Sequence, residues 1–145
     1  MNVAFIGCGK LGMPCAEEIA KAGHTVTGYD VASVTSDIVD IKNSIAQAVK
    51  FAKIVFVAVP TPHDPSYDGR APTAHLEPKD FDYAIVKSVL RECDSVMNPA
   101  QMLVLISTVI PGTVRRELEP LVTNTRFIQS IFDCYGQCCL GLCKS

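Results

Sequence analysis

Long apolar runs, strong net charge and a basic amino-terminal segment are all missing from this sequence of 145 residues. A net charge of −2 supplies no basic surface for nucleic acid or for an anionic membrane, so we expect neither as a partner. No apolar run is long enough to span a bilayer, and no secretory signal with its cleavage site is recognisable. We therefore expect a cytoplasmic protein whose cysteines are thiols.

The residues that are present describe an α/β domain. Hydrophobic residues make up 48% of the chain and charged residues 19%, as expected for one domain with a buried sheet. Short apolar runs alternate with stretches of helical character, which predicts a doubly wound parallel sheet of the Rossmann type. The predicted strands are Val3–Ile6, Thr25–Tyr29, Ile54–Val59, Met102–Ile106 and Arg126–Ile128.

Helices are predicted between these strands, together with one long loop from His63 to Pro78. The first should begin after Gly9, end at Gly23 and bury Leu11, Cys15 and Ile19. The others, in order, are a partly helical Ala32–Lys42, a helix Ile45–Phe51 capped by Ser44, a helix Asp80–Cys93 burying Phe81, Ala84, Ile85, Val89 and Val86, and a helix capped by Thr113 that runs to Val122.

A glycine motif follows the first strand directly. Gly7, Gly9 and Gly12 have the G-x-G-x-x-G spacing of dinucleotide-binding loops. The first glycine permits the tight turn, the second lets a diphosphate approach the backbone, and the third allows the helix to pack close to the sheet. Asp30 ends the second strand, where a carboxylate accepts both ribose hydroxyls and repels a 2′-phosphate. This arrangement predicts an NAD site and favours NAD over NADP.

Three motifs in this order resemble the amino-terminal domain of the UDP-glucose/GDP-mannose dehydrogenase family. They are Gly7–Gly12, the strand end Ala58-Val59-Pro60-Thr61-Pro62, and the loop Ser107-Thr108-Val109-Ile110-Pro111-Gly112-Thr113. The resemblance covers residues 1 to about 128, which we take as an NAD-binding domain, and leaves 129–145 as a tail without family resemblance. The second and third motifs are much more specific than the glycine loop.

The resemblance implies a function. Members of the family use NAD to oxidise the primary alcohol of a nucleotide sugar twice, giving a uronic acid, and a cysteine holds the intermediate as a thiohemiacetal. It implies Thr108 as the active-site threonine and homo-oligomers of the full-length protein. The expected cofactor-binding residues are Gly7, Cys8, Gly9, Lys10, Leu11, Gly12, Asp30, Val59, Pro60, Thr61, Ser107 and Thr108.

The same resemblance predicts that this chain alone is an inactive fragment. In the family, the sugar-binding domain and the catalytic cysteine, lysine and aspartate all lie beyond the position that corresponds to residue 145. The sheet would accordingly be incomplete at its carboxyl-terminal edge.

The tail from Gln129 to Ser145 has neither helix nor strand periodicity and holds four of the seven cysteines. Codons permitted for it, read one base later, spell Asn-Pro-Tyr-Leu-Ile-Ala-Met-Gly-Ser-Val-Ala-Trp-Asp-Phe-Val-Asn-Pro. That string matches the N-P-x-F/Y-L…G…A…D-F…P continuation expected of the family. The hypothesis is a frameshift near codon 129. The spacing of the tail cysteines, at Cys134, Cys138, Cys139 and Cys143, fits no standard metal site, so we expect no metal.

Two other functions fit parts of the pattern. A β-hydroxyacid dehydrogenase would share the glycine loop but would not predict the V-P-T-P strand end. A nucleotide-binding module without enzymatic activity would require the cysteine-rich tail to be a natural product of translation.

Overall fold

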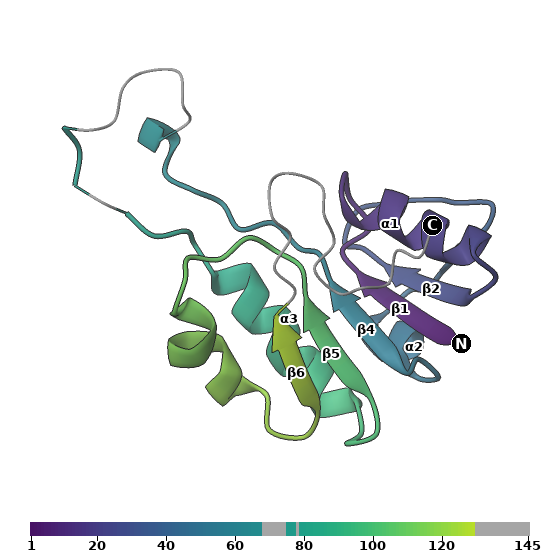
Figure 1. The fold of residues 1–145 in the computed structure, drawn as a ribbon. Helices are drawn as coiled ribbons and strands as arrows, with labels where there is room; N and C mark the ends of the chain where they lie inside the picture. Colours follow the sequence, from purple (N-terminus) through teal and green to yellow (C-terminus); the bar gives the residue numbers. More distant parts are fainter. Residues whose placement is uncertain (68–74, 78, 130–145) are drawn as a thin grey trace.

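Six parallel strands form one sheet in the order β3-β2-β1-β4-β5-β6 (Figure 1). The structure is a computed structural model that describes residues 1–67, 75–77 and 79–129. The strands are β1 (Asn2–Ile6), β2 (Thr25–Tyr29), β3 (Asp40–Ile41), β4 (Ile54–Val57), β5 (Met102–Leu105) and β6 (Arg126–Gln129). The strand order reverses direction between β1 and β4, so the predicted doubly wound parallel sheet is confirmed.

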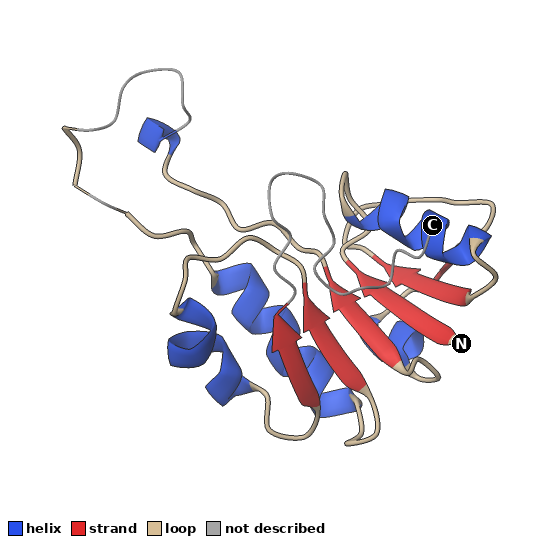
Figure 2. Ribbon diagram, viewed as in Figure 1, coloured by secondary structure: helices blue, strands red, loops and turns tan. Residues whose placement is uncertain are grey.

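Helices lie on both faces of this sheet (Figure 2). Helix α1 (Gly12–Lys21) packs on one face, against β1 and β2. Helices α2 (Ile45–Val49) and α3 (Ala84–Val96) pack on the other, together with the π-helical turn η2 (Val114–Leu118) and the 3₁₀ turn η3 (Glu119–Leu121). One more 3₁₀ turn, η1 (Pro65–Tyr67), lies in the loop after β4.

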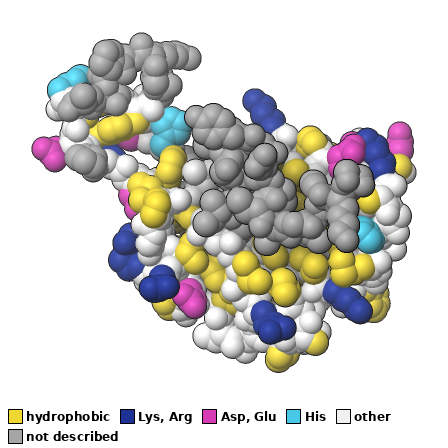
Figure 3. All heavy atoms as spheres, viewed as in Figure 1, with side chains coloured by type: hydrophobic (Ala, Val, Ile, Leu, Met, Phe, Trp, Pro, Cys, Tyr) yellow, Lys and Arg dark blue, Asp and Glu magenta, His cyan; other side chains and the backbone are white. Residues whose placement is uncertain are grey.

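Strand β1 has buried side chains on both of its faces, because it lies near the centre of the sheet. Val3 and Phe5 face α1, while Ala4 and Ile6 face the core shared by α2 and α3. Strand β4 is covered less evenly, and Phe56, which stacks on Phe5 with 4.9 Å between ring centroids, is only half-buried. Figure 3 shows hydrophobic side chains gathered over the strands on the face turned to the viewer.

The buried stripe of α1 differs from the prediction. Leu11 precedes the helix and is 49% exposed, while Gly12 and Ala16 are buried and Cys15 and Ile19 are half-buried. Cys15 and Ile19 pack against the core beneath the helix, so the predicted stripe is wrong only at Leu11. The predicted end was right, because Gly23 follows the helix with a φ of +90°.

The segment after Asp30 is not helical, contrary to prediction. Residues 31–39 form irregular turns, and the short strand β3 follows them. The predicted cap of α2 is confirmed, because the Ser44 hydroxyl accepts a hydrogen bond from the Gln47 N–H at 3.3 Å. The helix itself ends at Val49, two residues earlier than predicted.

Helix α3 begins four residues later than predicted. The Asp82 carboxylate accepts the Ala84 N–H at 2.8 Å, which holds the chain in a turn before the helix. Its buried residues include Val86, Leu90 and Cys93, whereas the expected Ile85 is 41% exposed. Leu90 and Cys93 follow Val86 at helical spacing. The buried face therefore lies about one position later in the sequence than the predicted Ile85 and Val89.

Thr113 does not cap a helix with its side chain, which corrects the prediction for the segment after β5. Its hydroxyl instead accepts a hydrogen bond from the Arg116 guanidinium at 3.3 Å, and the chain continues as the turns η2 and η3.

None of the helices in the described ranges is both long and apolar enough to cross a membrane. Most of the predicted tail, residues 130–145, lies outside the described residues, as does part of the predicted loop 63–78.

Candidate functional site

The motifs singled out in the sequence all lie at the carboxyl edge of the sheet. The glycine loop leaves β1, Asp30 ends β2, the V-P-T-P segment leaves β4, and the loop from Ser107 leaves β5. These four strands are neighbours, in the order β2-β1-β4-β5. Ligands of open α/β sheets bind in the crevice at this edge, where the strand order reverses.

Close backbone packing explains two of the three loop glycines. Gly7 has a φ of +93°, and a Cβ there would lie 2.6 Å from the Ala58 carbonyl oxygen. A Cβ on Gly12 would lie 1.8 Å from the Gly7 carbonyl oxygen. Both positions therefore require glycine for the fold itself.

Gly9 has a different environment. It is exposed, and a Cβ built on it would meet nothing within 4 Å. The fold therefore places no steric demand for glycine at this position. Open space above a backbone at the start of a helix is what a diphosphate group needs in order to approach the free N–H groups.

Asp30 joins the glycine loop to the end of β2. Its Oδ2 accepts the Cys8 N–H at 2.7 Å, and its Oδ1 accepts the Ala32 N–H at 2.8 Å. Each carboxylate oxygen can accept two hydrogen bonds, so both retain one acceptor position for a ligand hydroxyl. The side chain is thus already fixed in place and still able to bind.

A hollow of about 430 Å³ opens beside this carboxylate. Its walls come from the end of β2, the turn after it and the residues that follow β3, including Tyr29, Val34, Ile41 and Asn43. The hollow combines apolar side chains with polar groups and adjoins the ribose acceptor, as a site for the adenine end of a dinucleotide must.

The loop after β5 lies against the loop after β4. The Ser107 hydroxyl donates to the Val59 carbonyl at 2.6 Å, and Ser107 is buried. Thr108 follows it and is exposed at the crevice edge, like Pro60, whereas Val59 and Thr61 are half-buried. The structure therefore brings together the predicted residues of these two loops.

Comparison with known proteins agrees with this geometry. Residues 31–134 match the family model described as the UDP-glucose/GDP-mannose dehydrogenase family, NAD binding domain. The chain belongs to this family. The match confirms NAD as the expected cofactor, and it covers the motifs after β4 and β5 without relying on the glycine loop.

Individual relatives extend the match across most of the chain. A GDP-mannose 6-dehydrogenase of Pseudomonas syringae pv. tomato is 26% identical over 86% of this chain. The match spans 32% of that relative, so the chain corresponds to about a third of the length of the relatives it matches.

Solved structures share the fold. GDP-mannose dehydrogenase of Pseudomonas aeruginosa has a TM-score of 0.71, 20% identity and coverage of 92% of this chain and 37% of its own. For 3-hydroxyisobutyrate dehydrogenase of Mycobacterium tuberculosis these values are 0.62, 21%, 89% and 39%.

Within the dehydrogenase domain, Cys8 is a packing residue. Its side chain is 2% exposed, and its Sγ occupies the space beside Gly28: a Cβ added to Gly28 would lie 2.8 Å from this sulfur. Burial and the charge of Asp30 raise the pKa of the Cys8 thiol to about 11. Burial likewise raises the pKa of Cys93 to about 12. Neither thiol is available as a thiolate near neutral pH.

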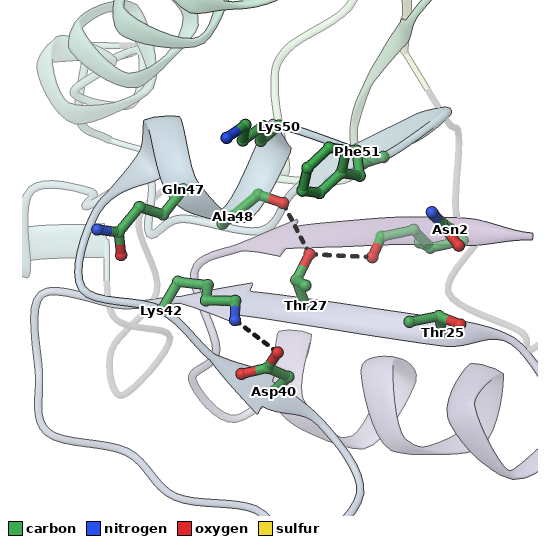
Figure 4. Close-up of a pocket in the computed structure, with 11 residues that line it drawn as sticks. Asn2, Thr25, Thr27, Asp40, Lys42, Gln47, Ala48, Lys50 and Phe51 are labelled. Atoms are coloured by element: carbon green, nitrogen blue, oxygen red, sulfur yellow. Dashed lines mark hydrogen bonds and ion pairs between the residues drawn. The ribbon is translucent and has the colours of Figure 1, made fainter.

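A second hollow of about 480 Å³ lies away from the cofactor edge (Figure 4). It lies between α2 and the beginnings of β1 and β2, where Asn2 and Thr25 line it. The Thr27 hydroxyl, on its wall, contacts the Ala48 carbonyl at 2.7 Å and the Val3 carbonyl at 3.3 Å. These contacts hold α2 against the sheet.

One cluster at the cofactor edge has no signal in the sequence. Tyr83, just before α3, lies among Asp80, Ile110 and Thr113 and is 5% exposed. The sequence predicts a helix that begins at Asp80 and assigns no role to Tyr83. A tyrosine inside a predicted helix has no local pattern that would distinguish a partner of a distant loop from a core residue.

Proposed function

We propose that the crevice at the carboxyl edge holds NAD, and that the chain supplies the cofactor half of a nucleotide-sugar dehydrogenase. The observation that carries the proposal is that neighbouring loops along this edge are joined to one another. Asp30 is bonded to the glycine loop, Gly7 packs on Ala58, and Ser107 is bonded to Val59. A ligand that follows this edge meets each predicted residue in turn.

The residues have distinct parts in this proposal. The loop Gly7–Gly12, with Cys8, Lys10 and Leu11 between the glycines, faces the diphosphate. The N–H groups of Gly7 and Cys8 donate to the Tyr29 carbonyl and to Asp30, so the proposed donors to the diphosphate are the N–H groups from Gly9 onward. Asp30 accepts the adenosine ribose hydroxyls, and the hollow beside it takes the adenine. The residues Val59, Pro60, Thr61 and Ser107 form the wall of the nicotinamide half.

Thr108 is the proposed catalytic residue of this chain. Thr108 is exposed and directly follows Ser107, which is buried and hydrogen-bonded to Val59. This hydrogen bond limits how far Thr108 can move beside the crevice. When bound, NAD supplies the hydride acceptor for oxidation of an alcohol. The part of Thr108 is to orient the reacting alcohol by a hydrogen bond, which requires the hydroxyl group to be held in position.

The proposed reaction of the full-length protein is the two-step oxidation of a nucleotide-sugar primary alcohol to a uronic acid. Relatives that carry the names GDP-mannose 6-dehydrogenase and UDP-glucose dehydrogenase support this class of substrate. The family match favours it over a β-hydroxyacid dehydrogenase, since a shared fold is the only link to that group. We also propose that the full-length protein is a cytoplasmic homo-oligomer; the three thiols of the described residues, Cys8, Cys15 and Cys93, support a reducing environment.

We further propose that 1–128 is the NAD-binding domain and that the tail from residue 129 is read out of frame. The shifted reading of permitted codons supports this, because it continues the family pattern directly after Ile128. Sequencing the DNA for several hundred bases past codon 128 tests the proposal. An uninterrupted second frame that encodes the rest of a dehydrogenase is expected, and a frame without it would refute the frameshift.

Calorimetric titration tests the cofactor site directly. The chain as it stands is expected to bind NAD saturably and to form no NADH with GDP-mannose or UDP-glucose. A version restored by correcting the frame is expected to form two NADH per sugar, and Thr108→Val in that version to lose most of this activity while still binding NAD. Absence of saturable NAD binding to both proteins would contradict the proposed function.

A further inference from the structure

The loop from Ser107 to Thr113 is attached to the rest of the molecule at two points on either side of Thr108. The first is the hydrogen bond from the Ser107 hydroxyl to Val59. The second is the hydrogen bond from the Ile110 N–H to the Tyr83 hydroxyl, at 3.1 Å. Between these points Thr108 is exposed and Val109 is half-buried. The conformation at Thr108 therefore depends on both attachments.

The second attachment is made by Tyr83, a buried residue. Tyr83 is 5% exposed and directly precedes α3, and its ring meets that of Phe81 edge to face at 6.3 Å between centroids. Figure 1 shows the loop that leaves β5 passing beside the beginning of α3. The tyrosine thus joins two segments that are far apart in the sequence and that both border the crevice.

The hydroxyl of Tyr83 is itself oriented by its neighbours. It donates to the Asp80 carboxylate, which leaves its lone pairs directed to the Ile110 N–H. Burial and the hydrogen bond to Asp80 raise the pKa of Tyr83, so the hydroxyl stays protonated and keeps this direction at neutral pH. Arg116 reaches the same carboxylate at 3.9 Å and donates to the Thr113 hydroxyl at 3.3 Å.

We propose that Tyr83 is a positioning residue that acts through the Ile110 N–H to hold Thr108 at the nicotinamide half of the crevice. This inference rests on the proposed function, since it assigns a purpose to the loop within that site. The glycine loop and Asp30, which bind the adenosine half, have no contact with this attachment. Loss of the tyrosine hydroxyl should therefore affect one half of the cofactor and spare the other.

Two ligands separate these halves. NAD occupies the whole crevice, whereas ADP-ribose lacks the nicotinamide and uses only the ribose and diphosphate groups. Tyr83→Phe keeps the buried ring and removes only the hydroxyl. We expect the dissociation constant for NAD to rise about fivefold or more, with that for ADP-ribose within twofold of the unaltered chain. Tyr67→Phe is the matched control, because that hydroxyl donates to the Glu77 carbonyl in the loop after β4, and it should change neither constant.

Hydrogen exchange at residues 107–113 provides a readout that is independent of NAD. We expect faster exchange there in Tyr83→Phe, with exchange in β1 and α1 unchanged. Equal weakening of NAD and ADP-ribose, or unchanged exchange in the loop, would overturn the proposal. If Tyr83→Phe does not fold, Asp80→Asn replaces it, since it disturbs the orientation of the same hydroxyl. If the unaltered chain binds no NAD, the proposed function fails, and the exchange measurement alone decides whether the attachment holds the loop.

Discussion

At the scale of single residues, the glycine loop separates the requirements of folding from those of binding. Gly12 and Gly9 lie three residues apart, yet an added methyl group would meet the Gly7 carbonyl oxygen at 1.8 Å in one case and open space in the other. Substituting Gly12 is therefore expected to change mainly the stability, and substituting Gly9 mainly the affinity for NAD.

Gly9→Ala should leave the free energy of unfolding nearly unchanged and weaken NAD binding at least tenfold, because its methyl group fills the approach of the diphosphate. Gly12→Ala should lose about 3 kcal/mol or more through overpacking against a backbone oxygen, which exceeds the gain of about 1 kcal/mol in helix propensity. Urea unfolding and calorimetric titration measure the two quantities. Full NAD affinity in Gly9→Ala would show that the cofactor does not approach this loop.

The buried thiols provide a second test at this scale. Cys8 and Cys93 have pKa values raised to about 11 and about 12, while Cys15 is half-buried and its pKa is raised by burial alone. Only thiolates react with iodoacetamide, so Cys15 should be the first of these three cysteines to be alkylated at pH 8 in the folded chain. Peptide mass spectrometry measures the order. Rapid alkylation of Cys8 in the native protein would contradict the packing role given to it.

The glycines and Asp30 could be predicted from the sequence because each meets a local requirement, namely backbone space or the carboxyl end of a strand. Tyr83 could not, because its partner Ile110 is 27 residues away and only the folded chain brings them together. Leu11 was predicted wrongly for a related reason. Hydrophobicity favoured a buried position, but Leu11 precedes α1, and the buried residues of the helix are Gly12 and Ala16.

At the scale of secondary structure, Asp94 joins the end of α3 to the segment that leads into β6. Its carboxylate accepts the N–H groups of Thr123, Asn124 and Thr125 at 3.0–3.3 Å, together with two threonine hydroxyls. Burial raises the pKa of Asp94, but these hydrogen bonds outweigh it and hold the pKa below its ordinary value. The element that carries β6 therefore depends on an ionised side chain.

Asp94→Asn should destabilise the chain by about 1–3 kcal/mol at pH 7. The amide nitrogen of asparagine takes the place of one carboxylate oxygen and cannot accept the hydrogen bonds that this oxygen accepts. A carboxylate whose folded pKa is lowered contributes stability above its unfolded pKa near 3.8, and this contribution is lost as pH falls through the folded pKa. The difference in unfolding free energy between the two proteins should therefore shrink below about pH 4. Urea unfolding from pH 3 to pH 7 measures it, and a difference independent of pH would contradict the assignment.

Strands were predicted more accurately than helices in this chain. Buried parallel strands are continuous apolar runs, so β4 and β5 were recognisable, although each ends before the predicted residue. The start of α3 depends instead on a turn closed by the Asp82 side chain, and β3 consists of two residues with little pattern of their own. Such short elements are determined by their neighbours in the sheet rather than by local propensity.

At the scale of the whole molecule, the described residues contain the edge proposed to bind the cofactor, from the hollow beside Asp30 to the loop of Thr108. A ligand that binds only the folded state raises its free energy of unfolding by an amount that grows with the logarithm of the ligand concentration above the dissociation constant. At a concentration of 100 times the dissociation constant, NAD should add about 2.7 kcal/mol, which corresponds to roughly 5–10 °C in Tm for a domain of this size.

NADP should raise the Tm much less at the same concentration. Both oxygens of Asp30 are already directed by the N–H groups of Cys8 and Ala32, so the carboxylate cannot turn away from a 2′-phosphate without breaking these hydrogen bonds. Differential scanning fluorimetry with NAD, NADP and GDP-mannose compares the three ligands, and Gly9→Ala is the control that folds but should respond to NAD with a smaller shift. Equal shifts with NAD and NADP would show that Asp30 does not face the ribose. A shift with GDP-mannose alone would place a sugar-nucleotide site within the described residues. It would contradict the proposal that this chain supplies only the cofactor half of the enzyme.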